Sequence, residues 1–253
     1  MLDNMIDLPM SLHDIAALFD RMDLVALLCL FFAWLLIGWL IQNPPKSRPS
    51  VALLMAEYRR EWMRQMVYRN PRIFDAQTLT TLRQGTSFFA SAAMIAIGAA
   101  LAAVGNVDQL IDVASDLSIN NDPRIVFEAK LLVVLFFLTN AFLKFVWSHR
   151  LFGYCAVMMG AVPNDENNPD AIPRALKAAE INITGTRSYN QGLRSIYFAL
   201  ATTAWMIGPL ALIVATLVTF GVLWRRDFAS RSRAVILAAT DGMEHSADNR
   251  REQ

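Results

Sequence analysis

The stretch from Ile196 to Trp224 constrains this chain most, because it carries no ionisable side chain except the phenol of Tyr197. At about 1.5 Å of rise per residue, a helix of this length crosses a hydrocarbon core of about 30 Å. The composition agrees, since 55% of the 253 residues are hydrophobic and 18% are charged, whereas soluble domains carry about 25% charged residues. The chain is therefore expected to lie in a membrane.

Four stretches are apolar over a membrane-spanning length. They predict an all-α fold, a polytopic membrane helical bundle with four transmembrane helices plus amphipathic interfacial helices. The expected spans are about residues 24–41, 87–104, 127–147 and 196–224. They form a four-span membrane domain, 24–224, in which 42–86 and 148–195 are expected to be helical loops. An acidic N-terminal lead, 1–23, precedes it and a polar tail, 225–253, follows it.

Basic residues predict how the spans are oriented. The 42–86 loop holds eight of them and the 148–195 loop holds five, whereas the N-terminal lead and the 105–126 connection hold one each. The positive-inside rule places both basic loops in the cytoplasm. Four spans then leave both termini outside.

The polar tail argues against this placement. Four arginines follow the last span directly: Arg225, Arg226, Arg231 and Arg233. The span itself contains Gly208 and Pro209, and we expect a continuous helix that kinks at Pro209. The alternative is a break at this pair into a re-entrant hairpin, which returns the tail to the cytoplasm.

Small residues dominate the second span and predict close helix packing there. Small side chains let helix backbones approach where burial of apolar surface gives no driving force in lipid. We therefore expect this helix at the centre of the bundle. The candidate packing residues are Ala92, Ala96, Gly98 and Ala100, with Gly208 and Pro209 in the fourth span.

Two polar residues, Asn140 and Lys144, lie inside the third span, one turn apart on the same helical face. For Lys144, as for Lys130, we expect the long stem to reach the membrane interface. Asn140 lies deeper, and an interhelical hydrogen bond to Ser91 or Thr203 is the expected structural role. The alternative is a polar path for a substrate along Asn140 and Lys144.

A basic cluster is expected where the second and fourth spans enter the cytoplasmic leaflet. On the fourth span, the i, i+3, i+7 spacing puts its members on one helical face. Arginine recognises phosphate bidentately, so the cluster is a candidate lipid or phosphate site. The candidate residues are Arg83, Gln84, Arg187, Asn190 and Arg194.

The cluster also has a purely structural interpretation, which the expected abundance of arginine at this depth favours. In that interpretation these arginines pair with Glu57, Glu61 or Asp75 and only set the topology.

Two motifs resemble a known family. They are RREWMRQMVYRNPRIFDAQTLTTLRQGTSFFASA, which begins at Arg59, and RSYNQGLRSIYFALATTAWMIGPL, which begins at Arg187. Over most of residues 20–230 the chain resembles the domain-of-unknown-function 599 family of integral membrane proteins. The resemblance implies a multi-span helical membrane protein of unassigned activity, and it supplies no catalytic residues.

The sequence contains none of the H-E-x-x-H, G-x-S-x-G, P-loop or C-x-x-C motifs. We therefore expect no enzyme, no cofactor and no metal. The favoured function is a non-enzymatic scaffold or accessory membrane subunit with an anionic lipid site in the cytoplasmic leaflet. A transporter or channel-like protein is the alternative, and a membrane-embedded enzyme acting on lipid has the least support.

The same features predict the protein's surroundings. We expect a multi-pass protein of the cell membrane, of the bacterial inner-membrane type, with membrane lipids as partners. Helices rich in small residues also suit association in a homo-oligomer or with other membrane subunits. The net charge of +1 gives no argument for nucleic acid.

Overall fold

The computed structural model describes residues 19–45, 47–116 and 123–238, and these residues form helices and connections with no strand among them. The predicted all-α fold class is confirmed. Four helices are long and apolar enough to cross a membrane: α2, α4, α6 and the helix that begins at Pro209. The elements are α2 (Arg21–Gln42), α3 (Val51–Val67), α4 (Ile73–Gly105), α5 (Val107–Asp116), α6 (Arg124–Gly160), α7 (Ala171–Thr203), the 3-10 turn η1 (Ala204–Met206) and α8 (Pro209–Phe228).

Parts of the predicted domains fall outside this description. Most of the acidic lead, 1–18, lies outside the described residues, and so do 117–122 and the end of the tail, 239–253.

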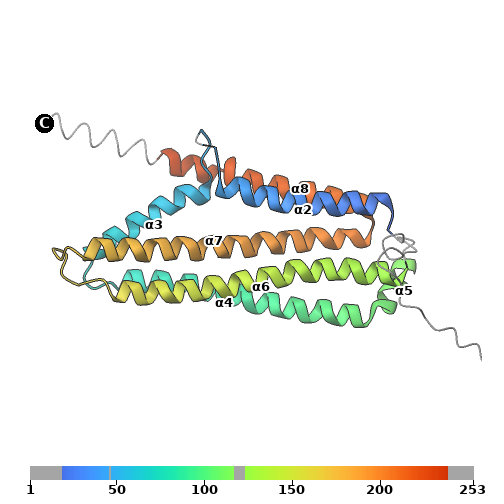
Figure 1. Cartoon of the computed structure of the whole chain (residues 1–253), viewed down its shortest axis with the longest axis horizontal. Helices are drawn as coiled ribbons and strands as arrows, with labels where there is room; N and C mark the ends of the chain where they lie inside the picture. Colours follow the sequence, from blue (N-terminus) through green and yellow to red (C-terminus); the bar gives the residue numbers. More distant parts are fainter. Residues whose placement is uncertain (1–18, 46, 117–122, 239–253) are drawn as a thin grey trace, which may run out of the picture.

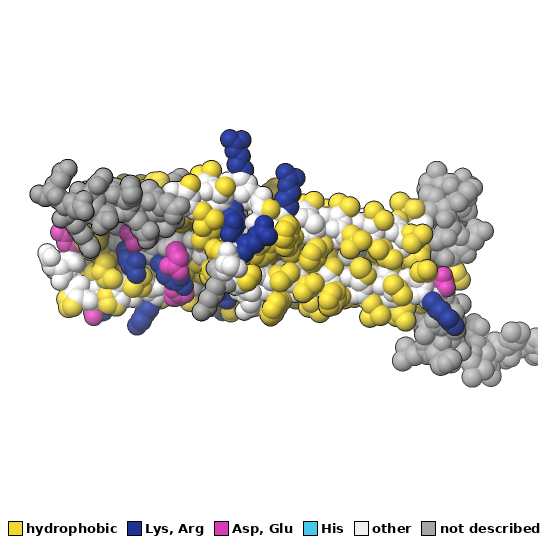
Figure 2. Space-filling model, turned by 90° about the horizontal axis from the view of Figure 1, so that it is seen from above, with side chains coloured by type: hydrophobic (Ala, Val, Ile, Leu, Met, Phe, Trp, Pro, Cys, Tyr) yellow, Lys and Arg dark blue, Asp and Glu magenta, His cyan; other side chains and the backbone are white. Residues whose placement is uncertain are grey.

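The long antiparallel pair α6 and α7 runs the length of the molecule, and the other helices pack around it (Figure 1). Helix α4 lies on α6, while α2 and α8 lie beside α7 along one half and α3 covers α7 along the other. We call the first part the apolar half (21–42, 87–105, 124–147, 192–207 and 209–224) and the second the charged half (51–86 and 148–190). Figure 2 shows hydrophobic side chains over the apolar half, and Lys and Arg gather from the middle of the molecule into the charged half, with further charged side chains at the far end of the apolar half.

Two glycines of α7 leave room for aromatic rings of α6. A Cβ added at Gly192 would lie 2.7 Å from Cε1 of Phe145, and one added at Gly185 would lie 3.2 Å from Cε1 of Phe152. The ring of Phe145 is fully buried and stacks on Phe89 at 5.5 Å between centroids, so it cannot move aside freely. At these glycines, and not at those of α4, side chains of the neighbouring helix occupy the space that a Cβ would need.

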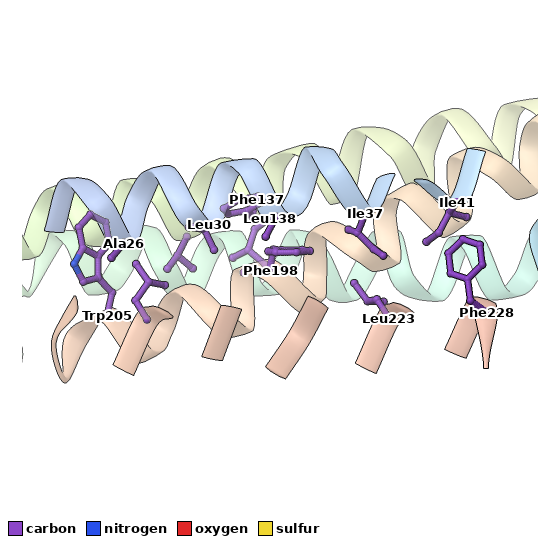
Figure 3. Packing of buried hydrophobic residues seen from close by; sticks show 14 residues of the cluster. Ala26, Leu30, Ile37, Ile41, Phe137, Leu138, Phe198, Trp205, Leu223 and Phe228 are labelled. Carbon is purple, nitrogen blue, oxygen red and sulfur yellow. The ribbon is translucent and has the colours of Figure 1, made fainter. Parts of the chain in front are cut away.

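The apolar half has a continuous core between α2, α6, α7 and α8 (Figure 3). Helix α2 turns one face inward, with Ala26, Leu30 and Ile37 fully buried. Its opposite face is exposed and apolar, with Leu28 and Phe32 among the side chains on it. A monomeric soluble protein rarely exposes such a large apolar surface. An outward apolar face is the arrangement expected of a helix in contact with lipid.

The charged half has a core of its own, built from α3, α4, α6 and α7. The connections predicted as helical loops are thus mostly extensions of the long helices, and α6 continues without a break to Gly160. Helix α3 buries Met63 and Met66 in this core. Arg60 of α3 also pairs with Glu180 of α7 at 2.6 Å.

The predicted continuous fourth span, 196–224, is wrong. Helix α7 ends at Thr203, and after η1 the chain reverses at Gly208, whose φ of 150° and ψ of 170° are tolerated essentially by glycine alone. Pro209 then occupies the first turn of α8, where its missing N–H is not needed. The turn is tied to the start of α2, because Trp205 Nε1 donates a hydrogen bond to Asp23 Oδ1 at 2.7 Å.

The reversal places the end of α8 beside the end of α2 (Figure 1). Arg233 Nε donates to the carbonyl oxygen of Pro49 at 3.0 Å, and the guanidinium of Arg48 lies 5.1 Å from the ring centroid of Trp224. The tail arginines therefore lie at the same end of the bundle as both basic loops. The expectation that the segment directly after the last span lies at the opposite end from these loops is therefore wrong, while the termini themselves, 1–18 and 239–253, lie outside the described residues.

Helix α4 is not at the centre of the bundle. In its most apolar stretch of 18 residues, only 6% of the residues are buried, against 50% in the corresponding stretch of α6. Helix α6 therefore takes the central position. Ala92 and Gly98 are exposed, and nothing lies within 4 Å of a Cβ added at Gly98. Ala96 and Ala100 pack partly against the core of the apolar half. The small residues of α4 are thus mostly an outer surface of this chain.

A topology experiment tests the reversal at Gly208. Reporters fused after Asn168 and after Gln253 are expected on the same side of the membrane, because α7 and α8 run in opposite directions. A reporter fused after Gly105 is expected on the other side. Activities of a cytoplasm-specific reporter give the assignment. A Gln253 fusion that agrees with the Gly105 fusion contradicts the hairpin.

One substitution made at two glycines tests the packing. Gly192→Leu is expected to destabilise the protein by at least about 1–3 kcal/mol, the typical cost of overpacking, because its side chain enters the space of the Phe145 ring. Gly98→Leu is the matched control and should leave the stability of the single chain unchanged. Thermal unfolding of both variants in neutral detergent measures the difference. Equal loss at both positions would show that α4 packs against something in the assembled protein.

Candidate functional site

A cavity of about 480 Å³ lies at the boundary between the apolar and charged halves. It is enclosed by the last turns of α2 and α8, the first half of α3 and the middle parts of α4, α6 and α7. We call it the arginine cavity. Its polar lining is Gln42, Arg59, Thr81, Thr186, Arg187, Tyr189, Asn190, Arg194, Arg226 and Asp227, and its apolar lining is Ile41, Val51, Ala52, Leu53, Met55, Ala56, Leu82, Phe152 and Ile183.

Three separate structural features bring the charged groups together. The 187, 190, 194 face of α7 points into the cavity, as its helical spacing predicts. Helix α3 packs across α7 and brings Arg59, which donates a hydrogen bond to Asn182 Oδ1. The reversal at Gly208 returns the chain, so that Arg226 and Asp227 in the last turn of α8 complete the lining.

The four cavity arginines form no ion pair among the described residues. Arg194 is only 5% exposed, and Asp227 attracts it without contacting it as an ion-pair partner. Arg226 lies over the ring of Tyr197, 5.8 Å from its centroid. Arg187 is exposed at the rim. Four guanidiniums thus line the cavity together with one carboxylate, which attracts Arg194 and Arg226.

The carboxylates expected as structural partners are engaged elsewhere. Glu57 pairs with Arg60, and Glu61 pairs with Arg64 at 3.3 Å. Asp75, which is fully buried, pairs with Arg69 and accepts a hydrogen bond from Trp62 at 2.7 Å. The interpretation in which these carboxylates neutralise the arginines on the predicted face of α7 is therefore wrong.

Burial makes the charge of the cavity costly. It lowers the pKa of the Arg59 guanidinium, whose Nε is buried without a hydrogen-bond partner. A guanidinium does not lose its proton in a protein, so the cost of incomplete solvation remains. An anion bound beside it would relieve this cost.

The structure separates the predicted site residues into two groups. Arg187, Asn190 and Arg194 line one cavity, as the sequence predicts. Arg83 and Gln84 are exposed and outside the lining, although Leu82 and Gly85 belong to it. Successive residues of a helix point about 100° apart, so Arg83 and Gln84 turn to the outer face of α4.

Sequence reasoning missed three charged residues of the lining. In the sequence, Arg59 counts only as one of the eight basic residues of the 42–86 loop. Arg226 and Asp227 follow the last apolar stretch, and Arg226 is one of the tail arginines that argued against four spans. The tail arginines and the Gly208–Pro209 pair together indicate a hairpin, and this hairpin returns Arg226 to the end of the bundle that holds the basic loops.

The polar residues of the third span lie outside the arginine cavity. Asn140 Nδ2 donates to Ser195 Oγ at 2.7 Å, so it makes an interhelical hydrogen bond of the expected kind with a different partner. Lys144 is half-buried. Lys130 does not reach the surface, since it is fully buried with its ammonium 5.7 Å from the ring centroid of Trp205.

Among the described residues, no group of three or more His, Cys, Asp or Glu could hold a metal ion. The chemistry that the arginine cavity offers is therefore anion recognition by guanidinium, amide and hydroxyl groups beside an apolar wall.

The family described as "Protein of unknown function, DUF599" matches residues 25–232. The chain belongs to this family. No curated protein and no solved structure matches it. The match extends from α2 to the segment after α8, so it includes every helix that lines the arginine cavity.

The unpaired charge predicts an unusual effect on stability. Arg194→Met is expected to raise the melting temperature of the delipidated protein, because it removes a buried charge that no carboxylate pairs. Each 1 kcal/mol corresponds to about 2–4 °C for a protein of this size.

The control is Arg60→Met, which removes a paired guanidinium of the same α3–α7 region and should leave the melting temperature unchanged or lower it. A fall at Arg194 larger than the fall at Arg60 would mean that Arg194 is neutralised within the protein.

Proposed function

We propose that this is a multi-pass protein of the cell membrane, of the bacterial inner-membrane type, that binds a phosphate-bearing lipid headgroup in the arginine cavity. It acts as a non-enzymatic lipid-binding scaffold or accessory subunit. The observation that carries this proposal is the set of four guanidiniums without ion pairs, gathered at the end of the apolar half.

The chemistry of the lining favours a phosphate. Guanidinium groups bind phosphate oxygens bidentately, and Arg59 and Arg194 approach from different helices. Asn190 adds a neutral amide donor to the lining, whereas the Thr186 hydroxyl already donates to the carbonyl oxygen of Asn182 at 3.0 Å. Basic pockets between helices at the cytoplasmic side of membrane proteins are sites for lipid headgroups.

The apolar wall favours a lipid over a free anion. Ile41, Leu53 and Met55 line the cavity together with the arginines. Ile41 also belongs to the core of the apolar half, and Leu53 and Met55 are partly exposed, so apolar surface extends from the cavity to the outside of the protein. A headgroup held by the arginines leaves its apolar part along this wall.

The orientation in the membrane follows from the hairpin. The second half of α7 runs beside α2 as far as the Trp205–Asp23 hydrogen bond, and we propose that it is a fifth crossing. Both basic loops and the tail arginines then lie on one side, which the positive-inside rule makes cytoplasmic. The arginine cavity faces the cytoplasmic leaflet in this arrangement.

Transport along Asn140 and Lys144 has less support. The Asn140 amide is engaged by Ser195, and neither Asn140 nor Lys144 lines the cavity.

Lipid counting tests the proposal. The protein is delipidated in neutral detergent and titrated with phosphatidylglycerol, and native mass spectrometry counts the bound lipid. Arg194→Lys keeps the charge but loses the two-pronged geometry, so it should weaken binding, and Arg194→Gln should weaken it further. Arg83→Gln is the matched control, because it removes a guanidinium at a similar depth outside the cavity. Equal occupancy in all four proteins, or equal binding of phosphatidylcholine, contradicts the proposal.

A further inference from the structure

The lining of the arginine cavity has a large excess of positive charge. Arg59, Arg187, Arg194 and Arg226 face a single carboxylate, Asp227, which leaves three positive charges in excess. The other ionisable group in the lining is the phenol of Tyr189, which is neutral near pH 7.

No neighbouring carboxylate reduces this excess by direct pairing. On α3 and α7, the elements that bring Arg59 and Arg194, the acidic side chains Glu57, Glu61 and Glu180 pair with or bond Arg60 and Arg64 and lie outside the lining. Asp227 attracts both Arg194 and Arg226 and is the one counter-charge inside. The residues of the lining therefore do not themselves supply the missing negative charge, and an anionic ligand would do so.

The number of charges on the ligand follows from this excess. A phosphodiester headgroup carries one negative charge and leaves most of the excess uncompensated. A terminal phosphate carries about 1.5 to 2 negative charges near neutral pH and presents three acceptor oxygens. A diphosphate carries more. Groups of this kind can accept from more than one of the guanidinium groups that line the cavity.

The size and the walls of the cavity favour a ligand that is larger than a free phosphate. A volume of about 480 Å³ lies within the range of sites for small organic ligands. Its apolar lining, which includes Leu53, Met55 and Phe152, would otherwise face water beside a small ion.

We infer that the arginine cavity selects an amphiphile with a phosphomonoester or diphosphate headgroup over a phosphodiester lipid of the same apolar part. This inference rests on the proposed function and assigns the substrate class of the same site. The energy of one guanidinium with a ligand scales with the ligand's charge. Loss of Arg194 must therefore weaken binding of a doubly charged headgroup by a larger factor than binding of a singly charged one.

The experiment titrates delipidated protein in neutral detergent with phosphatidic acid and with phosphatidylglycerol of identical chains, at pH 8. Inorganic phosphate and pyrophosphate form two further arms. We expect phosphatidic acid to bind at least about tenfold more tightly than phosphatidylglycerol, because even one further compensated charge is worth a 1.4 kcal/mol step or more. The inorganic ions should bind more weakly than phosphatidic acid.

Three variants accompany the wild type. Arg194→Gln and Arg226→Gln should each reduce binding of phosphatidic acid by more than binding of phosphatidylglycerol, and Arg83→Gln should change neither. Arg226 lies exposed at the rim, so its variant keeps the test valid if the buried Arg194 position disturbs folding. Melting temperatures confirm that each variant is folded.

The outcomes separate the two proposals. Equal affinity for both lipids, reduced by Arg194→Gln and Arg226→Gln, overturns the charge selectivity and leaves the lipid site standing. Binding of both lipids that is independent of Arg194 and Arg226 overturns the lipid site itself. Pyrophosphate or phosphate binding as tightly as phosphatidic acid, and depending on the same arginines, overturns the amphiphile in favour of a free anion.

Discussion

The close packing of α6 against α7 is the interaction on which the rest of the structure depends. Gly192 leaves room for the ring of Phe145, and Gly185 does the same for Phe152. The two helices can therefore run side by side through both halves of the molecule (Figure 1). Helices α2, α4 and α8 pack around this pair in the apolar half, and α3 packs on it in the charged half. The arginine cavity lies at the boundary between the two halves, where the helices that pack on α6 and α7 change.

The position of the cavity explains why its charges are tolerated. In the proposed orientation, a guanidinium at the end of the apolar half is close to headgroups and water, whereas deeper in the bundle the same unpaired charge would be prohibitive. The surrounding basic residues show the contrast. Arg60 and Arg69 form ion pairs with carboxylates and stabilise the charged half. Arg59 and Arg194, which line the cavity, form no ion pair among the described residues. Proteins commonly keep such unfavourable groups at sites where binding requires them.

The reversal at Gly208 connects the topology to the site. One residue in a conformation that glycine alone tolerates turns an apolar stretch into two antiparallel helices. The same turn brings Arg226 and Asp227 back to the boundary, where they complete the lining with α7. It also places the tail arginines with the other bases. A kinked continuous helix would have neither property, because it would carry Arg226 to the far side.

The sequence by itself determined the helices, their apolar stretches and the shared face of Arg187 and Arg194, because these depend on local periodicity and on the absence of charge. Tertiary structure alone decided which helical glycine packs closely against a neighbouring helix. Gly98 and Gly192 are both glycines in helices, yet only Gly192 faces another helix. Such choices depend on how each helix is rotated about its axis and which neighbour it meets. Those are set by contacts between residues far apart in the chain, which a local pattern does not encode.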